Sequence, residues 1–220
     1  MTAHSHVYIF DAYGTLFDVH SAARAHAASL GDDWLRVSEA WRAKQLEYTW
    51  VYSSARQMRS FRDVTRESLL TALTAAGSDV AAAESLLNSY RRLAPFTEVE
   101  SVLAALRERG DRLAILSNAD QDMLEELVLA AGFVGIFDHL ISVAGAEAYK
   151  PAPEVYKLAV DSLGIAAQEV HFVSSNRWDI AGAKAFGFKT VWINRRRQPD
   201  EYRDFVADQA FEDLRGLLAQ

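Results

Sequence analysis

The sequence predicts an α/β fold in which a parallel sheet core carries an inserted helical cap domain. Three observations lead to this prediction. Short, nearly continuous apolar runs occur five times, as is typical of strands buried on both faces. Amphipathic stretches that end in glycine separate the later runs. Between the first run and the second, residues 19–92 contain helical patterns and no convincing strand.

Each predicted strand stops at a polar residue, and the five strands are residues 7–10, 113–116, 140–143, 170–173 and 190–193. Glycine directly after a periodic apolar segment usually marks the left-handed end of a helix. We therefore expect helices that end at Gly110, Gly132, Gly164 and Gly187. Strands that alternate with helices in this way predict a Rossmann-like parallel sheet covered on both faces.

Two domains are expected from this pattern. Residues 1–18 and 93–220 form the predicted α/β core domain, and residues 19–92 form the predicted helical cap domain. The clearest helical patterns in the cap cover residues 34–52 and 66–77. A chain of 220 residues is long for one minimal domain and short for two full ones, which fits one core with an insertion.

Composition limits the possible functions. The net charge of −7 argues against general binding of nucleic acid, and no apolar run approaches the ~18–20 residues of a membrane span. Without cysteine the chain has no disulfide, thiolate nucleophile or thiolate-bound metal. No secretion signal is recognisable, so we expect a cytoplasmic protein. An anionic substrate would need positive charge supplied locally.

Ligands of open parallel sheets bind beyond the carboxyl ends of the strands. The candidate residues at those ends are Asp11, Tyr13, Thr15, Ser117, Asn118, Ser174, Ser175, Asn176 and Asp179, with Lys150 on a short loop after the third strand. Any one alone would be an ordinary turn or cap residue. Polar groups at all four strand ends predict a binding or catalytic site instead.

Four segments carry these residues in order: FDAYGTLFD, ILSN, YKPAPEVY and VSSNRWD. They resemble the four motifs of the haloacid dehalogenase superfamily, in its branch of L-2-haloacid dehalogenases. The cap segment WRAKQLEYTW is similar to that branch too, so the resemblance covers nearly the whole chain. It implies hydrolysis of L-2-haloalkanoates to D-2-hydroxyalkanoates and halide, no cofactor, and a homodimer. Whether fluoroacetate is a substrate depends on bond strength and pocket size, which the sequence does not decide.

Two positions distinguish this branch from the phosphatases of the superfamily. Tyr13 stands where phosphatases carry an aspartate that protonates the departing alkoxide, a proton that a weakly basic halide does not need. Ser175 stands where they carry a magnesium-binding aspartate, and serine is a poor ligand for that ion. We expect no metal site. The alternatives are a magnesium-dependent phosphatase, which a chelator would inhibit, and a non-catalytic binding protein.

The mechanism that the resemblance implies is double displacement. Asp11 attacks the halogen-bearing carbon, inverts it and forms an aspartyl ester, which water then hydrolyses. Lys150 and nearby hydroxyls are suited to keep Asp11 ionised. Arg42, in the cap, resembles the residue that receives the departing halide, although a solvated helical arginine is the alternative.

The other roles come from the same resemblance. Ser117 and Asn118 are expected to hold the substrate, with Asn118 also facing the halide. Thr15 is expected to bond the nucleophile or to cap a helix. Tyr156 is expected either to join the Lys150 network or to be ordinary core.

Two sets of residues complete the predicted site. The set expected to order the hydrolytic water, with the base left open, is Ser174, Asn176 and Asp179. The set expected to form an apolar wall, with core packing as the alternative, is Tyr13, Leu46, Phe61 and Trp178. Ala119 stands where many relatives have glycine. The arginines 195–197 form either a solvated loop or an anion-binding run.

Overall fold

The computed structural model describes residues 6–219, and its centre is a six-stranded parallel sheet in the order β3-β2-β1-β4-β5-β6. The strands are β1 (Val7–Phe10), β2 (Arg112–Ser117), β3 (His139–Ser142), β4 (Val170–Ser174), β5 (Lys189–Ile193) and β6 (Gln209–Phe211). β1 and β4 lie side by side in the middle of the sheet. The predicted α/β fold is confirmed.

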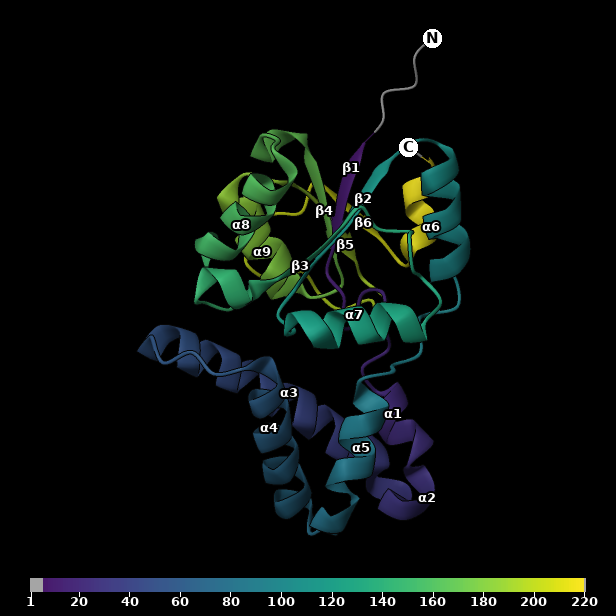
Figure 1. The fold of residues 1–220 in the computed structure, drawn as a ribbon, viewed down its shortest axis with the longest axis vertical. Coiled ribbons are helices and arrows are strands. Elements are labelled where there is room, and N and C mark those ends of the chain that lie inside the picture. The colour runs from purple at the N-terminus through teal and green to yellow at the C-terminus, as the bar shows by residue number, and fades with distance from the viewer. Residues whose placement is uncertain (1–5, 220) are drawn as a thin grey trace.

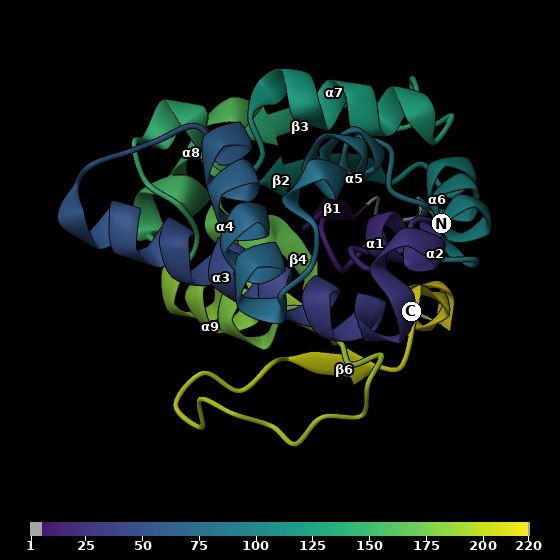
Figure 2. The ribbon, with the colours of Figure 1, turned by 90° about the horizontal axis from the view of Figure 1, so that it is seen from below.

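Only β1 has the predicted bounds: β2, β4 and β5 are one or two residues longer, β3 is shifted by one residue, and one further strand is present. The third strand ends at Ser142, and Val143 begins the 3-10 helix η3 (Val143–Ala146) because the Ser142 side chain accepts a hydrogen bond from Ala144 N at 3.2 Å. β6 was not predicted. Its residues are mostly exposed at the edge of the sheet (Figure 2), so they carry no apolar run that would indicate a strand.

Helices cover both faces of the sheet, and α6 lies on the opposite side from α8 and α9 (Figure 1). The helices of this part are α6 (Val99–Glu108), α7 (Gln121–Ala130), α8 (Pro153–Leu163), α9 (Arg177–Phe186) and the 3-10 helices η4 (Ala167–Glu169) and η5 (Leu214–Ala219). The glycines predicted to end four helices all have positive φ, as a left-handed helix end requires.

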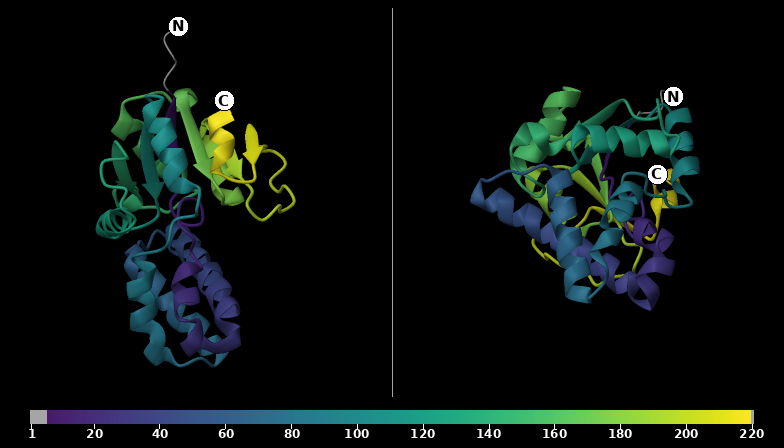
Figure 3. Two further views of the ribbon diagram at one scale, coloured as in Figure 1. Left: turned by 90° about the vertical axis from the view of Figure 1, so that its right-hand side faces the viewer. Right: turned by 60° about the horizontal axis from the view of Figure 1, so that its bottom comes forward.

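Between β1 and α6, residues 21–90 form helices and no strand, and we call them the helical unit. Its members are α1 (Ser21–Ala25), α2 (Ala27–Leu30), η1 (Gly31–Asp33), α3 (Trp34–Ala55), α4 (Phe61–Ala76), η2 (Val80–Ala82) and α5 (Ala83–Tyr90). The long helices α3 and α4 pack together, and Trp41 Nε1 donates to Thr65 O across 2.9 Å between them. Figure 3 shows the helical unit below the sheet, joined to it by two chain segments.

Those two segments run beside each other. Asp18 N donates to Ala94 O at 2.9 Å, and Phe96 N donates to Leu16 O at 3.0 Å. The carboxyl ends of the strands therefore face the helical unit (Figures 1 and 2). Within residues 6–219, none of the helices combines the length and the apolar character that crossing a membrane requires.

Candidate active site

Asp11 follows β1 directly and lies at the centre of the predicted site. Its side chain is nearly buried, and both carboxylate oxygens accept hydrogen bonds. Oδ1 accepts from Lys150 Nζ at 3.1 Å, and Oδ2 accepts from Thr15 Oγ1 at 2.9 Å and Asn176 Nδ2 at 2.8 Å. Thr15 Oγ1 also accepts from Ser175 N, so Thr15 orients the carboxylate and does not cap a helix.

Lys150 joins two carboxylates in the interior. Its Nζ lies 3.1 Å from Asp11 Oδ1 and 3.0 Å from Asp179 Oδ2, and its side chain is 1% exposed. Burial lowers the pKa of Lys150, but Asp11 and Asp179 outweigh that effect, so the pKa is raised above its ordinary value. The ammonium therefore stays charged beside the nucleophile candidate.

Tyr156 completes this buried network. Its hydroxyl donates to Asp179 Oδ1 at 2.7 Å, and both side chains are fully buried. Burial, followed by the Asp11 charge, raises the pKa of Asp179 to about 6 against the opposing effect of Lys150. Asp179 is thus a carboxyl group that can take up a proton near neutral pH.

The remaining residues at the strand ends shape their own loops. Asn118 Oδ1 accepts from Lys150 N at 3.0 Å, so it fixes the backbone of the lysine loop. Ser117 Oγ accepts from Ala119 N, and Ser174 Oγ accepts from Asn176 N, both at 3.1 Å. The two serines lie at the site without a hydrogen bond to Asp11 among the described residues.

Arg42 brings the helical unit to the strand ends. From α3, its Nη2 donates to Tyr13 O at 3.3 Å and its Nη1 donates to Gln45 Oε1 at 2.9 Å. Tyr90 also donates to Gln45 Oε1, at 3.0 Å. Arg42 is thus partly buried, and its guanidinium donates hydrogen bonds to two partners. A solvated helical arginine would have neither property.

The predicted apolar wall divides into two parts. Tyr13 packs against Phe61 with ring centroids 5.5 Å apart and stacks on Tyr90 at 5.4 Å. Leu46 and Trp178 instead line a cavity of about 670 Å³ between the helical unit and the sheet. Arg42 and Asn176 line the same cavity, so it extends to the residue that bonds Asp11 Oδ2.

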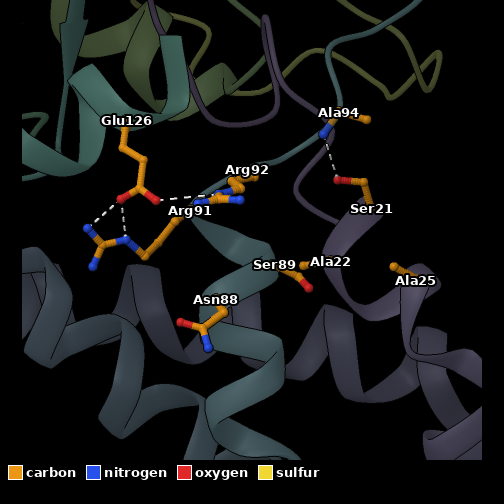
Figure 4. Close-up of a pocket in the computed structure, with 9 residues that line it drawn as sticks. All are labelled: Ser21, Ala22, Ala25, Asn88, Ser89, Arg91, Arg92, Ala94 and Glu126. Carbon is orange, nitrogen blue, oxygen red and sulfur yellow. Dashed lines mark hydrogen bonds and ion pairs between the residues drawn. The ribbon is translucent and has the colours of Figure 1, made fainter. Parts of the chain in front are cut away.

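A second cavity, of about 730 Å³, lies beside the two connecting segments. Figure 4 shows its walls, where Glu126 of α7 pairs with Arg91 and Arg92 and Ser21 accepts a hydrogen bond from Ala94 N. None of the predicted site residues lines it. The predicted site therefore lies at the strand ends and outside this cavity.

Three functional candidates were missed in the sequence. Gln45 and Tyr90 hold Arg42, and Asp120 accepts hydrogen bonds from the N-terminus of α4 at Phe61 N (3.0 Å) and Arg62 N (2.9 Å). Gln45 had a signal, because a residue three positions after Arg42 on a helix lies beside it. Tyr90 had none, since it comes from the far end of the insertion.

The expectation of a solvated loop at residues 195–197 is wrong for Arg195. Its side chain is only 16% exposed and pairs with Glu98 at 2.6 Å. Its Nη2 donates to Thr15 O at 2.9 Å. Arg195 therefore supports the loop that carries Thr15.

Between residues 6 and 219, no cluster of three or more histidine, aspartate or glutamate side chains has an arrangement that could hold a metal ion.

Comparison with known proteins agrees with this geometry. A family model described as haloacid dehalogenase-like hydrolase matches residues 6–187. Haloacetate dehalogenase H-2 of Moraxella sp. (strain B) is 44% identical over 188 residues, 84% of each chain. An (S)-2-haloacid dehalogenase of Pseudomonas sp. (strain YL) is 41% identical over 211 residues, 95% of this chain and 91% of the relative.

A solved structure extends the similarity to three dimensions. The L-2-haloacid dehalogenase of Xanthobacter autotrophicus with chloropropionic acid covalently bound superposes with a TM-score of 0.90 at 34% identity, over 97% of this chain and 96% of that one. The chain therefore belongs to the haloacid dehalogenase-like hydrolases, in the branch of the L-2-haloacid dehalogenases.

Proposed function

We propose that this protein hydrolyses the carbon–halogen bond of L-2-haloalkanoates and releases halide and the D-2-hydroxyalkanoate. One observation carries the proposal: the Asp11 carboxylate is held by one ammonium and two neutral donors, with Tyr13 where an acid would serve a phosphatase. The (S)-2-haloacid dehalogenase relatives support the substrate class. The relative with covalently bound chloropropionic acid supports an ester intermediate.

The first step is displacement of the halide. A carboxylate oxygen of Asp11 attacks the halogen-bearing carbon from the side opposite the halogen, so the carbon is inverted as the new C–O bond forms. The halide leaves with the electron pair of the broken bond. Arg42 and Asn118 are the groups that we assign to receive it, because a guanidinium stays charged at neutral pH and an amide N–H donates.

The second step is hydrolysis of the aspartyl ester. Water attacks the Asp11 carbonyl carbon and gives up one proton. The ester C–O bond then breaks, the departing alkoxide takes the second water proton to become the product hydroxyl, and the Asp11 carboxylate is regenerated. We assign the proton to Asp179, because its pKa of about 6 suits a base near neutral pH. Ser174 and Asn176 order the loop around that water, and Ser117 holds the substrate carboxylate.

Tyr13 suits a halide and not an alkoxide leaving group. Burial raises the pKa of its phenol well above the ordinary range, so it remains neutral and forms one wall of the alkyl pocket with Phe61. Leu46 and Trp178 form the opposite wall on the cavity side.

Domain roles and assembly belong to the same proposal. Residues 19–92 act as the cap that closes the site, and residues 1–18 and 93–220 act as the core. The two segments that join them, paired at Asp18 and Ala94, support this boundary. A cytoplasmic homodimer is expected from the family. Haloacetates are proposed as further substrates, because a haloacetate dehalogenase is 44% identical to this chain. Halide release from fluoroacetate would test how far this substrate range extends.

The deciding experiment measures halide release from L- and D-2-chloropropanoate in excess chelator, beside hydrolysis of p-nitrophenyl phosphate with magnesium. Chloride from the L isomer alone, unaffected by chelator, is expected. Magnesium-dependent phosphate release without chloride would establish the phosphatase alternative instead. In a single turnover in oxygen-18 water, the label should enter the Asp11 side chain before product. Asp11→Asn should lower turnover at least about 10⁴-fold.

A further inference from the structure

The three arginines after β5 have three different environments. Arg195 is partly buried and bonds Thr15 O, as described above. Arg197 is exposed and pairs with Glu212 at 3.0 Å, outside the cavity that Leu46 and Trp178 line. Arg196 is also exposed, but it lines that cavity, and its Nη2 lies 2.6 Å from His20 Nε2. Only Arg196 presents an exposed cation at the cavity rim from this run.

His20 holds Arg196 without neutralising it. Its Nδ1 lies 2.8 Å from Ser38 Oγ, and burial followed by the nearby Arg196 charge lowers the pKa of the imidazole. A neutral ring can place its proton on Nδ1 toward Ser38 and accept the Arg196 N–H at Nε2. Among residues 6–219, no carboxylate lies within ion-pair distance of Arg196. The guanidinium is therefore anchored by a neutral partner and keeps its full charge.

The other charges of the cavity are largely compensated. Its arginines 24, 177 and 195 are paired with Asp18, Asp200 and Glu98. Glu39 and Glu201 add negative charge to the walls. Arg42 lies further in and is held by Gln45. Without Arg196, the walls would hold Arg42 against Glu39 and Glu201, an excess of one negative charge on a chain of net charge −7.

The cavity also reaches a residue that bonds Asp11. Asn176 lines it and donates to Asp11 Oδ2 at 2.8 Å, while Arg196 lies at the side formed by the helical unit and the loop after β5. We propose that Arg196, held by His20, draws the carboxylate of the substrate into this cavity, and that the substrate reaches Asp11 by this route. The identity of the substrate in this inference rests on the proposed function, whereas the attraction of an anion rests on the charges that line the cavity.

The test compares three charge-neutralising variants. Arg196→Gln should lower kcat/KM for L-2-chloropropanoate about two- to fivefold at low ionic strength, with kcat unchanged, since a rim charge acts on encounter. The effect should fade near 1 M salt, where the Debye length is about 3 Å. Glu39→Gln, in the same cavity with the opposite sign, should raise kcat/KM. Arg197→Gln removes the same charge one residue away and should change neither constant.

Two further measurements separate the possible failures. Arg196→Lys keeps the positive charge, so its kcat/KM should depend on salt nearly as it does in the wild type. A loss caused by misfolding would not be reversed by this substitution. Calorimetric binding of propanoate, which contains no halogen, should weaken in Arg196→Gln and not in Arg197→Gln. If the wild type released no halide, the proposed function would fail, and this binding comparison would still decide the role of Arg196. Equal behaviour of the Arg196 and Arg197 variants, or an altered kcat alone, would overturn the inference.

Discussion

Lys150 Nζ donates a hydrogen bond to Asp11 Oδ1 across 3.1 Å, although 139 residues separate the two in sequence. The same ammonium lies 3.0 Å from Asp179 Oδ2, so one buried cation serves two buried carboxylates. In water such pairs contribute little, but removing one partner of a buried pair leaves uncompensated charge in the interior. This relationship predicts that loss of Lys150 would lower both stability and turnover.

We predict that Lys150→Met lowers the free energy of unfolding by about 3–5 kcal/mol, because it leaves Asp11 and Asp179 unpaired in the interior. Urea denaturation at pH 7.5 measures this change. Lys157→Met is the matched control, because the pair of Lys157 with Asp161 is exposed and should contribute less than about 1 kcal/mol. Equal losses in the two variants would contradict the prediction.

Turnover should depend on the protonation of Asp179. Its pKa is raised to about 6 by burial, so a base at this position is protonated and inactive at lower pH. We expect kcat to fall as the pH decreases through about 6. Because the folded pKa lies above the unfolded one, the effect on stability has the opposite sign: this group stabilises the fold below about pH 4 and loses that contribution as the pH rises through 6. A rate profile that stays flat down to pH 5 would exclude Asp179 as the base.

Asp120 should position Phe61 through the N-terminus of α4. Its carboxylate accepts hydrogen bonds from Phe61 N and Arg62 N, so Asp120→Ala should destabilise the protein by about 1 kcal/mol. It should also raise KM for longer substrates such as 2-chlorobutanoate more than it changes kcat. Asp122→Ala is the control, since Asp122 of α7 pairs with the exposed side chain of Arg62 on α4 and otherwise accepts a hydrogen bond from Met123 N in its own helix. The role in positioning would be refuted if both variants had the same KM pattern.

Two stacked tyrosines should respond differently to loss of the hydroxyl. The Tyr13 hydroxyl is buried without a hydrogen-bond partner among residues 6–219, so Tyr13→Phe should leave the free energy of unfolding unchanged or raise it by about 1 kcal/mol. Tyr90→Phe should lower it by about 1 kcal/mol, because the Tyr90 hydroxyl donates to Gln45 Oε1. Thermal denaturation of both variants gives the comparison. A Tyr13 variant as unstable as the Tyr90 variant would mean that the Tyr13 hydroxyl has a partner.

The sequence predicted the parts of the molecule whose environment leaves a local pattern. Strands buried on both faces appear as apolar runs, so β1 and β4 were located, and the polar residues after them, such as Asp11 and Asn176, could be placed at one edge of the sheet. The exposed edge strand β6 leaves no such pattern. For that reason the sheet was predicted with one strand too few.

Contacts between segments that are far apart in the chain could not be predicted from local sequence patterns. Tyr90 reaches Gln45 only because α5 packs beside α4 and α1, and Arg195 reaches Thr15 O only because the loop after β5 turns toward the first strand end. Arginine runs usually lie in solvent, which is why Arg195 was expected there. Its partners come from 180 and 97 positions earlier in the chain, so no spacing rule relates them.

The pairing of Asp18 with Ala94 means that the chain enters and leaves the helical unit at the same place. For the sheet-bearing part, the insertion is therefore equivalent to a loop whose two ends lie side by side, whatever its length or structure. A change in the length or sequence of the helices need not alter the register of β1 against β4. Evolution could thus exchange one continuous segment, and with it Leu46 and Phe61, while Asp11 and Lys150 kept their geometry.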